Sequence, residues 1–305
     1  MTQRPPLDPR LTEQRNPATT EIDRLSALEI VRVINDEDHK IAPAVATQLE
    51  QIAEAVEIAA DCFRRGGRLV YFGAGTSGRL GVLDASEMPP TYGTDPRMVR
   101  GVIAGGMDAL TNAIEGAEDS REEGGKAADD LELGPDDFAF GIAASGTTPY
   151  VHGALTRAKQ RGARTGFLLC TEPAEWMLAV YDVVIAPLAG PEVVTGSTRM
   201  KAGTATKLVL NTITTGAMIR LGKVFGNLMV DLRATNEKLR DRSERILMET
   251  LDLERDTARD LLARAGGSVK TAMVMDWCGI DRDEATRVLL RSGGRLGDVL
   301  KSDAR

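Results

Sequence analysis

Histidine, cysteine and aromatic residues are scarce in this chain. Its 305 residues include two histidines and three cysteines, and aromatic side chains make up 4%. Cys62, Cys170 and Cys278 lie far apart and match no C-x-x-C spacing, so neither a structural zinc site nor a redox pair is expected. Few aromatic rings are present to stack on bases or flat cofactors. The sequence therefore predicts chemistry without a metal or other cofactor, on a small, polar, anionic ligand.

Long apolar runs and blocks of positive charge are also missing. No stretch approaches the roughly 18 apolar residues of a membrane span, and the first ten residues lack the apolar core of a signal peptide. Asp and Glu number 45 against 38 Lys and Arg, which gives a net charge of −7. Neither nucleic acid nor a membrane is expected as a partner, and we predict a cytoplasmic protein.

Apolar periodicity predicts an α/β fold with a doubly wound, parallel, five-stranded sheet. Short apolar runs typical of buried parallel strands occur at 68–73, 98–105, 138–145, 165–170 and 182–187. Helical patterns occur at 22–34, 43–63, 77–87, 107–128, 149–161 and 201–224. Because helices alternate with most of the strands, ligands are expected at the carboxyl ends of the strands.

The same patterns divide the chain into three predicted parts. Residues 1–45 form an N-terminal arm and helix, and the first twenty of them, with four prolines, are predicted to be irregular. Residues 46–245 form the sheet domain. Residues 246–305 read as three short amphipathic helices separated by glycines, which predicts a small helical domain.

The first glycine loop, GAGTSGR at 73–79, follows the first predicted strand and opens a helix. It satisfies G-x-G-x-x-G, but Asp95 precedes the second strand, whereas a dinucleotide site needs an acidic residue after that strand. The remaining readings are a helix cap made by Thr76 and Ser77, or an anion site at a helix N-terminus. A phosphate monoester fits the second reading.

Two further loops repeat this hydroxyl and glycine chemistry. AASGTTPY at 143–150 ends the third predicted strand, and TGSTRMKAGTATK at 195–207 leads into the long helix. Three such loops at one edge of a parallel sheet predict a pocket lined with hydroxyls and backbone N–H groups.

This combination resembles the sugar isomerase (SIS) domain, and longer motifs narrow the resemblance. GAGTSGRLGVLDASEMPPTYG (73–93), IAGGMDALTNAIEGAEDS (103–120) and GPEVVTGSTRMKAGTATKLVLNTITT (190–215) are similar to those of the N-acetylmuramic acid 6-phosphate etherase family. The resemblance runs from about residue 10 to the C-terminal helices. It implies that the phosphate ligands are Thr76, Ser77, Ser145, Thr147 and Thr148, with Gly75 and Ser197 as neighbours.

The resemblance implies a lyase that removes D-lactate from the 6-phosphate of N-acetylmuramic acid by elimination and rehydration, in amino sugar catabolism. Ring opening gives a C1 aldehyde that acidifies the C2 proton, so acid and base groups suffice. Glu87 and Glu118 are the implied catalytic residues. Glu87 is expected to protonate the departing lactate oxygen and activate water, and Glu118 to assist with the C2 proton or the water.

Other candidates keep two readings each. Glu192 precedes the third hydroxyl loop, at the position where related isomerases place a catalytic base. It is either such a base or a residue that lies behind the site. Lys201 neutralises phosphate or is an exposed lysine at a helix start. His152 contacts substrate or only packs.

Two alternative functions remain open: a phosphosugar isomerase, and a non-catalytic phosphosugar-sensing regulator that controls a kinase. Lactate release distinguishes the etherase from the isomerase, and a regulator has no need of Glu87 and Glu118. The resemblance also implies a homodimer whose active site is completed by the neighbouring subunit.

Overall fold

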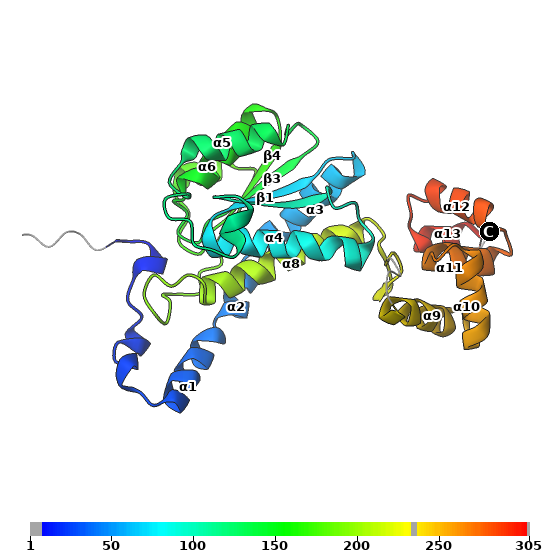
Figure 1. Ribbon diagram of the computed structural model, residues 1–305, viewed down its shortest axis with the longest axis horizontal. Coiled ribbons are helices and arrows are strands. Elements are labelled where there is room, and N and C mark those ends of the chain that lie inside the picture. The colour runs from blue at the N-terminus through cyan, green and yellow to red at the C-terminus, as the bar shows by residue number, and fades with distance from the viewer. Residues whose placement is uncertain (1–7, 233–236, 304–305) are drawn as a thin grey trace, which may run out of the picture. The chain divides into compact units, whose positions relative to one another are not determined.

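The computed structural model describes residues 8–232 and 237–303. The first seven residues of the predicted arm therefore lie outside the described residues. The chain divides into two compact units (Figure 1). One unit contains the described residues up to Ser86 together with Arg97–Thr214, and the other contains Glu87–Pro96 together with the described residues from Thr215 onward.

The first unit is built on a parallel five-stranded sheet in the order β2-β1-β3-β4-β5. Its strands are β1 (Leu69–Gly73), β2 (Val99–Ile103), β3 (Phe138–Ile142), β4 (Arg164–Leu168) and β5 (Val183–Ile185). The fold class and all five predicted strands are thus confirmed. Gly73 pairs with Ile103 on one side and Ile142 on the other, so the following loops leave the sheet at one edge.

Helices cover both faces of the sheet, as Figure 1 shows. They are α3 (Leu49–Arg64), α4 (Gly75–Tyr92), α5 (Arg121–Asp130), α6 (Pro149–Gln160), α7 (Glu175–Val180) and α8 (Lys201–Arg220). Val151 and Leu155 of α6 pack with Val70 and Phe72 on one face. On the other face, Tyr71 donates a hydrogen bond to Asp84 of α4.

The segment before the sheet is more divided than its periodicity predicts. Three 3-10 turns, Leu11–Glu13, Pro17–Thr19 and Ile22–Arg24, precede α1 (Ala27–Asp38) and α2 (Ile41–Ala46). Helix α1 begins late because Ser26 and Glu29 form a capping box.

The predicted helix over 107–128 is wrong in its first half. The structure has only a 3-10 turn at Met107–Leu110 and then an irregular loop before α5. Gly105, Gly106 and Gly116 adopt positive φ, which interrupts a right-handed helix, and Ser120 caps the N-terminus of α5.

The C-terminal unit is helical, but it has more elements than the three predicted helices. It contains α9 (Glu237–Leu251), α10 (Arg255–Arg264), α11 (Val269–Cys278), α12 (Arg282–Arg291) and α13 (Leu296–Asp303). An antiparallel pair, β6 (Val224–Phe225) and β7 (Leu228–Met229), follows α8, which ends four residues before the predicted end. In the described ranges, no helix is long and apolar enough to cross a membrane.

Candidate functional site

The first hydroxyl loop is held close to the sheet by glycine. A Cβ on Gly73 would lie 2.6 Å from the backbone nitrogen of Gly78, and one on Gly78 would lie 2.6 Å from Ile103 Cγ1. Helix α4 begins at Gly75, so the N–H groups of Thr76 and Ser77 belong to its first turn. Both side chains are half-buried. This geometry suits an anion at the helix N-terminus.

The second hydroxyl loop lies between β3 and α6. Ser145 Oγ and Thr147 Oγ1 are 3.0 Å apart, and Gly146 between them has a φ of 73°. Thr148 is the N-cap residue of α6, yet its side chain makes no capping hydrogen bond. The Thr148 hydroxyl is therefore not used as a helix cap.

The buried side chain of His152 supports the second hydroxyl loop. Its Nε2 lies 2.8 Å from the carbonyl oxygen of Gly146, and its Nδ1 lies 2.8 Å from the hydroxyl of Tyr181. Burial lowers the pKa of His152. A neutral ring that donates from Nε2 to Gly146 and accepts from Tyr181 satisfies both contacts.

The third hydroxyl loop leads into α8, whose N-terminus already has a carboxylate. Glu192 accepts hydrogen bonds from the backbone N–H groups of Lys201 and Ala202, each at 2.9 Å. Burial raises the pKa of Glu192. Ser197 is half-buried in the turn before the helix.

Lys201 is a buried residue, not an exposed lysine at a helix start. Its side chain is 1% exposed, and Nζ donates to Glu37 at 2.6 Å and to the Ala189 carbonyl at 2.8 Å. Burial alone raises the pKa of Glu37, but hydrogen bonds from Lys201, Lys40 and Asn16 outweigh it and lower that pKa to about 2.

Glu118 lies on the loop before α5 and is exposed. It lines a cavity of about 180 Å³ together with Gly75 and Arg79. Its carbonyl oxygen accepts a hydrogen bond of 3.0 Å from the N–H of Tyr150, two residues after Thr148. The structure therefore brings Glu118 next to the first loop and links its backbone to the second.

Glu87 is an exposed residue near the C-terminal end of α4. It follows Ser77 by ten residues on one helix, a rise of about 15 Å. Glu87 belongs to the second compact unit, whereas the hydroxyl loops and Glu118 belong to the first.

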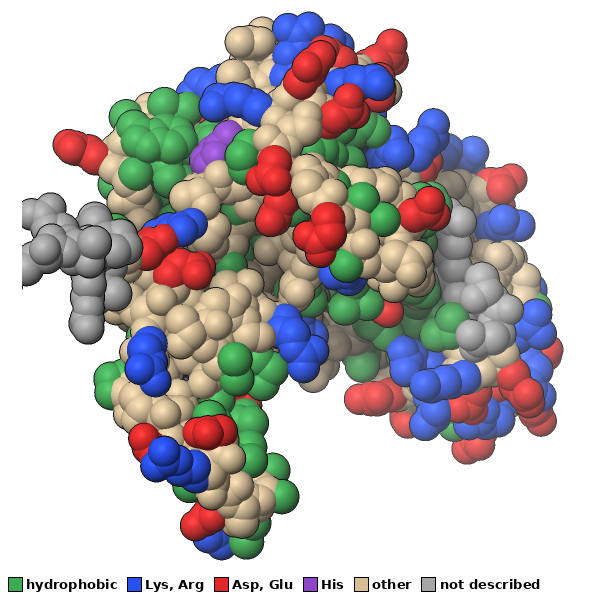
Figure 2. All heavy atoms as spheres, turned by 60° about the vertical axis from the view of Figure 1, so that its left-hand side comes forward, with side chains coloured by type: hydrophobic (Ala, Val, Ile, Leu, Met, Phe, Trp, Pro, Cys, Tyr) green, Lys and Arg blue, Asp and Glu red, His purple; other side chains and the backbone are tan. Residues whose placement is uncertain are grey.

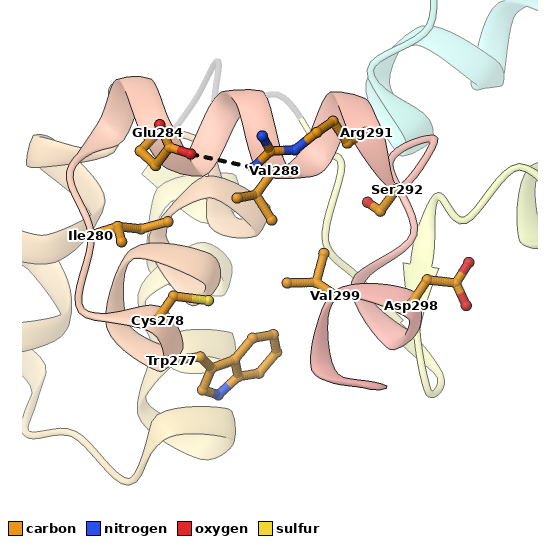
Figure 3. A pocket seen from close by; sticks show the side chains of 9 residues that line it. All are labelled: Trp277, Cys278, Ile280, Glu284, Val288, Arg291, Ser292, Asp298 and Val299. Carbon is orange, nitrogen blue, oxygen red and sulfur yellow. Dashed lines mark hydrogen bonds and ion pairs between the residues drawn. The ribbon is translucent and has the colours of Figure 1, made fainter. Parts of the chain in front are cut away.

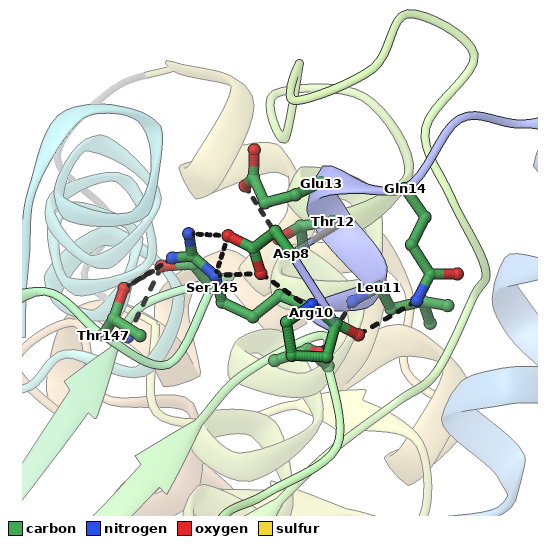
Figure 4. A network of polar contacts seen from close by, with 10 residues as sticks. Asp8, Arg10, Leu11, Thr12, Glu13, Gln14, Ser145 and Thr147 are labelled. Carbon is green, nitrogen blue, oxygen red and sulfur yellow. Dashed lines mark hydrogen bonds and ion pairs between the residues drawn. The ribbon is translucent and has the colours of Figure 1, made fainter. Parts of the chain in front are cut away.

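The N-terminal arm lies across the second and third loops. Arg10 Nη1 donates to Thr147 Oγ1 at 3.0 Å (Figure 4), and Gly196 N donates to the Thr12 carbonyl at 3.2 Å. Asn16 and Thr19 donate to the carbonyls of Pro191 and Val193. Residues 8–20 contain two short 3-10 turns and are otherwise irregular, and this described part of the arm is docked.

A separate cavity of about 860 Å³ lies in the C-terminal unit (Figure 3). Trp277, Cys278 and Val288 contribute apolar lining, and Arg291 pairs with Glu284 beside them. No residue predicted for the site lines this cavity. The face in Figure 2 carries acidic and basic side chains side by side, without a broad basic patch.

Comparison with known proteins decides the family. An N-acetylmuramic acid 6-phosphate etherase from Rhodopirellula baltica is 57% identical over 264 residues, which cover 87% of each chain. One from Photorhabdus laumondii is 53% identical over 273 residues, 90% of each chain. This chain belongs to the N-acetylmuramic acid 6-phosphate etherase family.

Two further comparisons of this family member are with a family model and with a solved structure. Residues 51–159 match the family described as glucokinase regulatory protein N-terminal SIS domain. A putative sugar-phosphate isomerase from Listeria monocytogenes is 14% identical with a TM-score of 0.48, covering 65% of this chain and 93% of that one.

Sequence reasoning about this etherase family member missed Arg79 and Arg10. Arg79 is the last residue of the first loop. Its guanidinium donates to the carbonyls of Leu110 and Asn112, and the residue lines the cavity of Glu118. Arg10 lies in the irregular arm, where no periodicity indicates which surface a side chain contacts.

Proposed function

We propose that this protein cleaves the D-lactyl ether of N-acetylmuramic acid 6-phosphate to give N-acetylglucosamine 6-phosphate and D-lactate. The observation that carries the proposal is the 57% identity to the N-acetylmuramic acid 6-phosphate etherase from Rhodopirellula baltica, over 87% of both chains. The hydroxyl loops at the carboxyl edge of the sheet support it, because they offer hydroxyl and N–H donors to a phosphate.

The proposed reaction is an elimination followed by addition of water. With the ring open, a base removes the C2 proton, and the C3–oxygen bond breaks as lactate leaves with a proton. Water then adds at C3, its proton goes to the enzyme base, and C2 is reprotonated. We assign the proton on the lactate oxygen and the activation of water to Glu87. Glu118, which shares a cavity with Gly75, assists at C2 or with the water.

We assign phosphate binding to Thr76, Ser77, Ser145, Thr147 and Thr148. Glu192 and Lys201 receive supporting roles, because their charged atoms are engaged by the N-terminus of α8 and by Glu37. We also assign contacts with the substrate to Ser197 and to Gly75, which lines the cavity of Glu118.

The proposal includes a homodimer in which the neighbouring chain supplies Glu87. Five bonds of about 1.5 Å separate C3 from the phosphorus, so the reacting carbon lies within ~7.5 Å of the phosphate. Glu87 is about 15 Å along α4 from Ser77 of its own chain. A second copy related by a two-fold axis can bring its own Glu87 to the loops. The three free cysteines suit the cytoplasmic location that we also propose.

The experiment is lactate release from N-acetylmuramic acid 6-phosphate, with the unphosphorylated sugar as control. Glu87→Gln is expected to lower turnover by about 10²–10⁴-fold, because general acid and base catalysis is lost while the shape is kept. Glu50→Gln, on the exposed surface of α3, is the matched control and should leave turnover unchanged.

Three outcomes contradict parts of the proposal. Near-normal turnover in Glu87→Gln removes Glu87 from the chemistry. Heavy oxygen from labelled water that appears in lactate, and not at the C3 hydroxyl, means that another bond is broken. Phosphosugar binding without lactate release favours the isomerase or the regulator.

A further inference from the structure

Arg10 contacts the second hydroxyl loop from the N-terminal arm, not from one of the loops that follow the strands. It comes from the arm, 137 residues away in sequence from Thr147, whose hydroxyl accepts its hydrogen bond at 3.0 Å. Thr147 Oγ1 is in turn 3.0 Å from Ser145 Oγ. The guanidinium therefore lies beside two hydroxyls to which we assign phosphate binding (Figure 4).

The rest of this guanidinium faces a carboxylate of its own segment. Asp8 accepts from Arg10 Nε at 2.9 and 3.0 Å, from Arg10 Nη2, and from the Arg10 backbone N–H at 3.0 Å. Within the described residues, the Asp8 carboxylate accepts its hydrogen bonds from Arg10. Its side-chain hydrogen bonds to Arg10 lower the pKa of Asp8 to about 2, so Asp8 is anionic at neutral pH.

The chain around Arg10 is fixed on its C-terminal side. Leu11 N donates to Thr171 Oγ1 at 2.9 Å, and the buried Thr12 is bonded through its carbonyl to Gly196 of the third loop. In the described part of the chain, by contrast, the contacts of the Asp8 carboxylate are to Arg10. A competing anion can therefore displace the Asp8 carboxylate without moving the backbone of Leu11 and Thr12.

The charges at the site show why a phosphate would bind to the Arg10 guanidinium. A phosphate monoester carries about −1.5 to −2 charges at neutral pH, whereas the hydroxyl loops offer uncharged donors. The lysine predicted for this purpose, Lys201, has its ammonium buried against Glu37. A guanidinium presents a planar fork that binds phosphate with two parallel hydrogen bonds.

We propose that Arg10 is a ligand of the substrate's 6-phosphate and that Asp8 competes with this phosphate for the same guanidinium. The inference rests on the proposed function, because it assigns the phosphate to the hydroxyl loops. The N-terminal arm is then part of the binding site. A ligand must compete with the Asp8 carboxylate for the Arg10 guanidinium, so weak ligands are excluded.

The test is calorimetric titration of N-acetylglucosamine 6-phosphate and of inorganic phosphate into the full-length protein. Arg10→Gln should weaken binding of both by about 10–100-fold, the usual size for charge-assisted hydrogen bonds. Asp8→Asn should tighten binding severalfold, because the competing charge is gone. With substrate, Arg10→Gln should raise KM and leave kcat nearly unchanged.

Arg15→Gln is the matched control: an exposed arginine of the same arm, whose loss should leave affinity unchanged. An ion pair that only holds the arm in place predicts that Asp8→Asn and Arg10→Gln weaken binding alike, and that result overturns the inference. So does unchanged affinity in Arg10→Gln.

Failure of the proposed function looks different. If the protein releases no lactate, but Asp8→Asn and Arg10→Gln still move the affinity for inorganic phosphate in opposite directions, the inference stands alone. If the double substitution Ser77→Ala and Ser145→Ala leaves phosphosugar affinity unchanged, the hydroxyl loops are not the phosphate site, and both proposals fall.

Discussion

At the scale of single residues, His152 shows how a buried ring fixes a binding loop. It stacks on Phe167, with ring centroids 5.1 Å apart, and holds the Gly146 carbonyl and the Tyr181 hydroxyl. His152→Phe keeps the stacking and removes both hydrogen bonds. We expect a loss of about 1–3 kcal/mol in the free energy of unfolding, measured by urea denaturation at pH 7.5.

The pH dependence of this variant provides its control. Because burial lowers the pKa of His152, the unfolded chain binds its proton first as the pH falls below about 6.5. Wild-type stability therefore declines toward the lowered pKa, and His152→Phe should remove that part of the decline. His39→Gln, at an exposed position, should retain it. Equal pH slopes in His152→Phe and wild type would contradict this assignment.

The buried pair of Glu37 and Lys201 gives a second residue-scale prediction. Glu37→Gln leaves the Lys201 ammonium buried without its counter-charge, and we expect a loss of about 3–5 kcal/mol in unfolding free energy at pH 7. Adding Lys201→Met should recover much of it, because no unpaired charge then remains. Urea denaturation of both variants measures the difference.

Acid titration tests the same pair. The pKa of Glu37 is lowered to about 2, so its contribution is complete above about pH 4.5 and is lost as the pH falls toward 2. Glu37→Gln should lack this acid-dependent loss, and the exposed Glu50→Gln should keep it. A double variant no more stable than Glu37→Gln would show that the charge pair is not the cause.

At the scale of elements, α5 and α6 touch through glycine. A Cβ on Gly153 would lie 1.9 Å from the Arg121 carbonyl oxygen, and one on Gly124 would lie 1.9 Å from that of Tyr150. Gly153→Ala forces the two backbones apart, and we expect a loss of about 3 kcal/mol or more, measured by thermal and urea unfolding.

Gly125→Ala on the same α5 is the matched control. Its nearest neighbour would be 3.8 Å away, so alanine is accommodated and should stabilise the helix by up to about 1 kcal/mol. Similar losses in both variants would mean that the close approach of α5 and α6 is not what limits Gly153.

Sequence patterns predict these elements unevenly. Strands β1, β3 and β5 are buried along their whole length, which produces continuous apolar runs such as 138–142, whereas the edge strand β2 contains the exposed Arg100. The loop before α5 contains residues that also fit a helix, and the positive φ of Gly116, which interrupts a right-handed helix, is not visible in the apolar pattern.

The site residues likewise fall into those that the sequence indicates and those that it does not. The hydroxyl loops are visible because their residues are contiguous in sequence. The burial of Lys201 and the contact of Arg10 are not visible, since their partners Glu37 and Thr147 lie 164 and 137 residues away. Local pattern carries no information about such pairings.

At the scale of the whole molecule, the proposed dimer makes a complementation prediction. Glu87→Gln and the Ser77→Ala, Ser145→Ala double variant should each be inactive, for different reasons. Mixed after dissociation and reassociation, they should regain up to about one quarter of wild-type activity, because half of the dimers are mixed and each then holds one complete site. Lactate release measures it.

Light scattering on the same samples should give about twice 32.8 kDa. Mixing each inactive variant with itself controls for refolding. If the mixture stays inactive while mixed dimers are present, Glu87 acts on the loops of its own chain. A fully active monomer would remove the dimer from the mechanism.

The hydrogen bond from Tyr150 N–H to the Glu118 carbonyl has a consequence for substrate length. It ties the loop that carries a candidate catalytic carboxylate to the first turn of the helix that follows the second phosphate loop. In the proposed function, the second hydroxyl loop binds the phosphorylated end of the sugar and Glu118 lies at the reacting end. The hydrogen bond therefore couples the positions of these two segments. The backbone thus sets the distance between the phosphate-binding loop and Glu118. A sugar that is one carbon shorter or longer is then bound with a different carbon at the carboxylate.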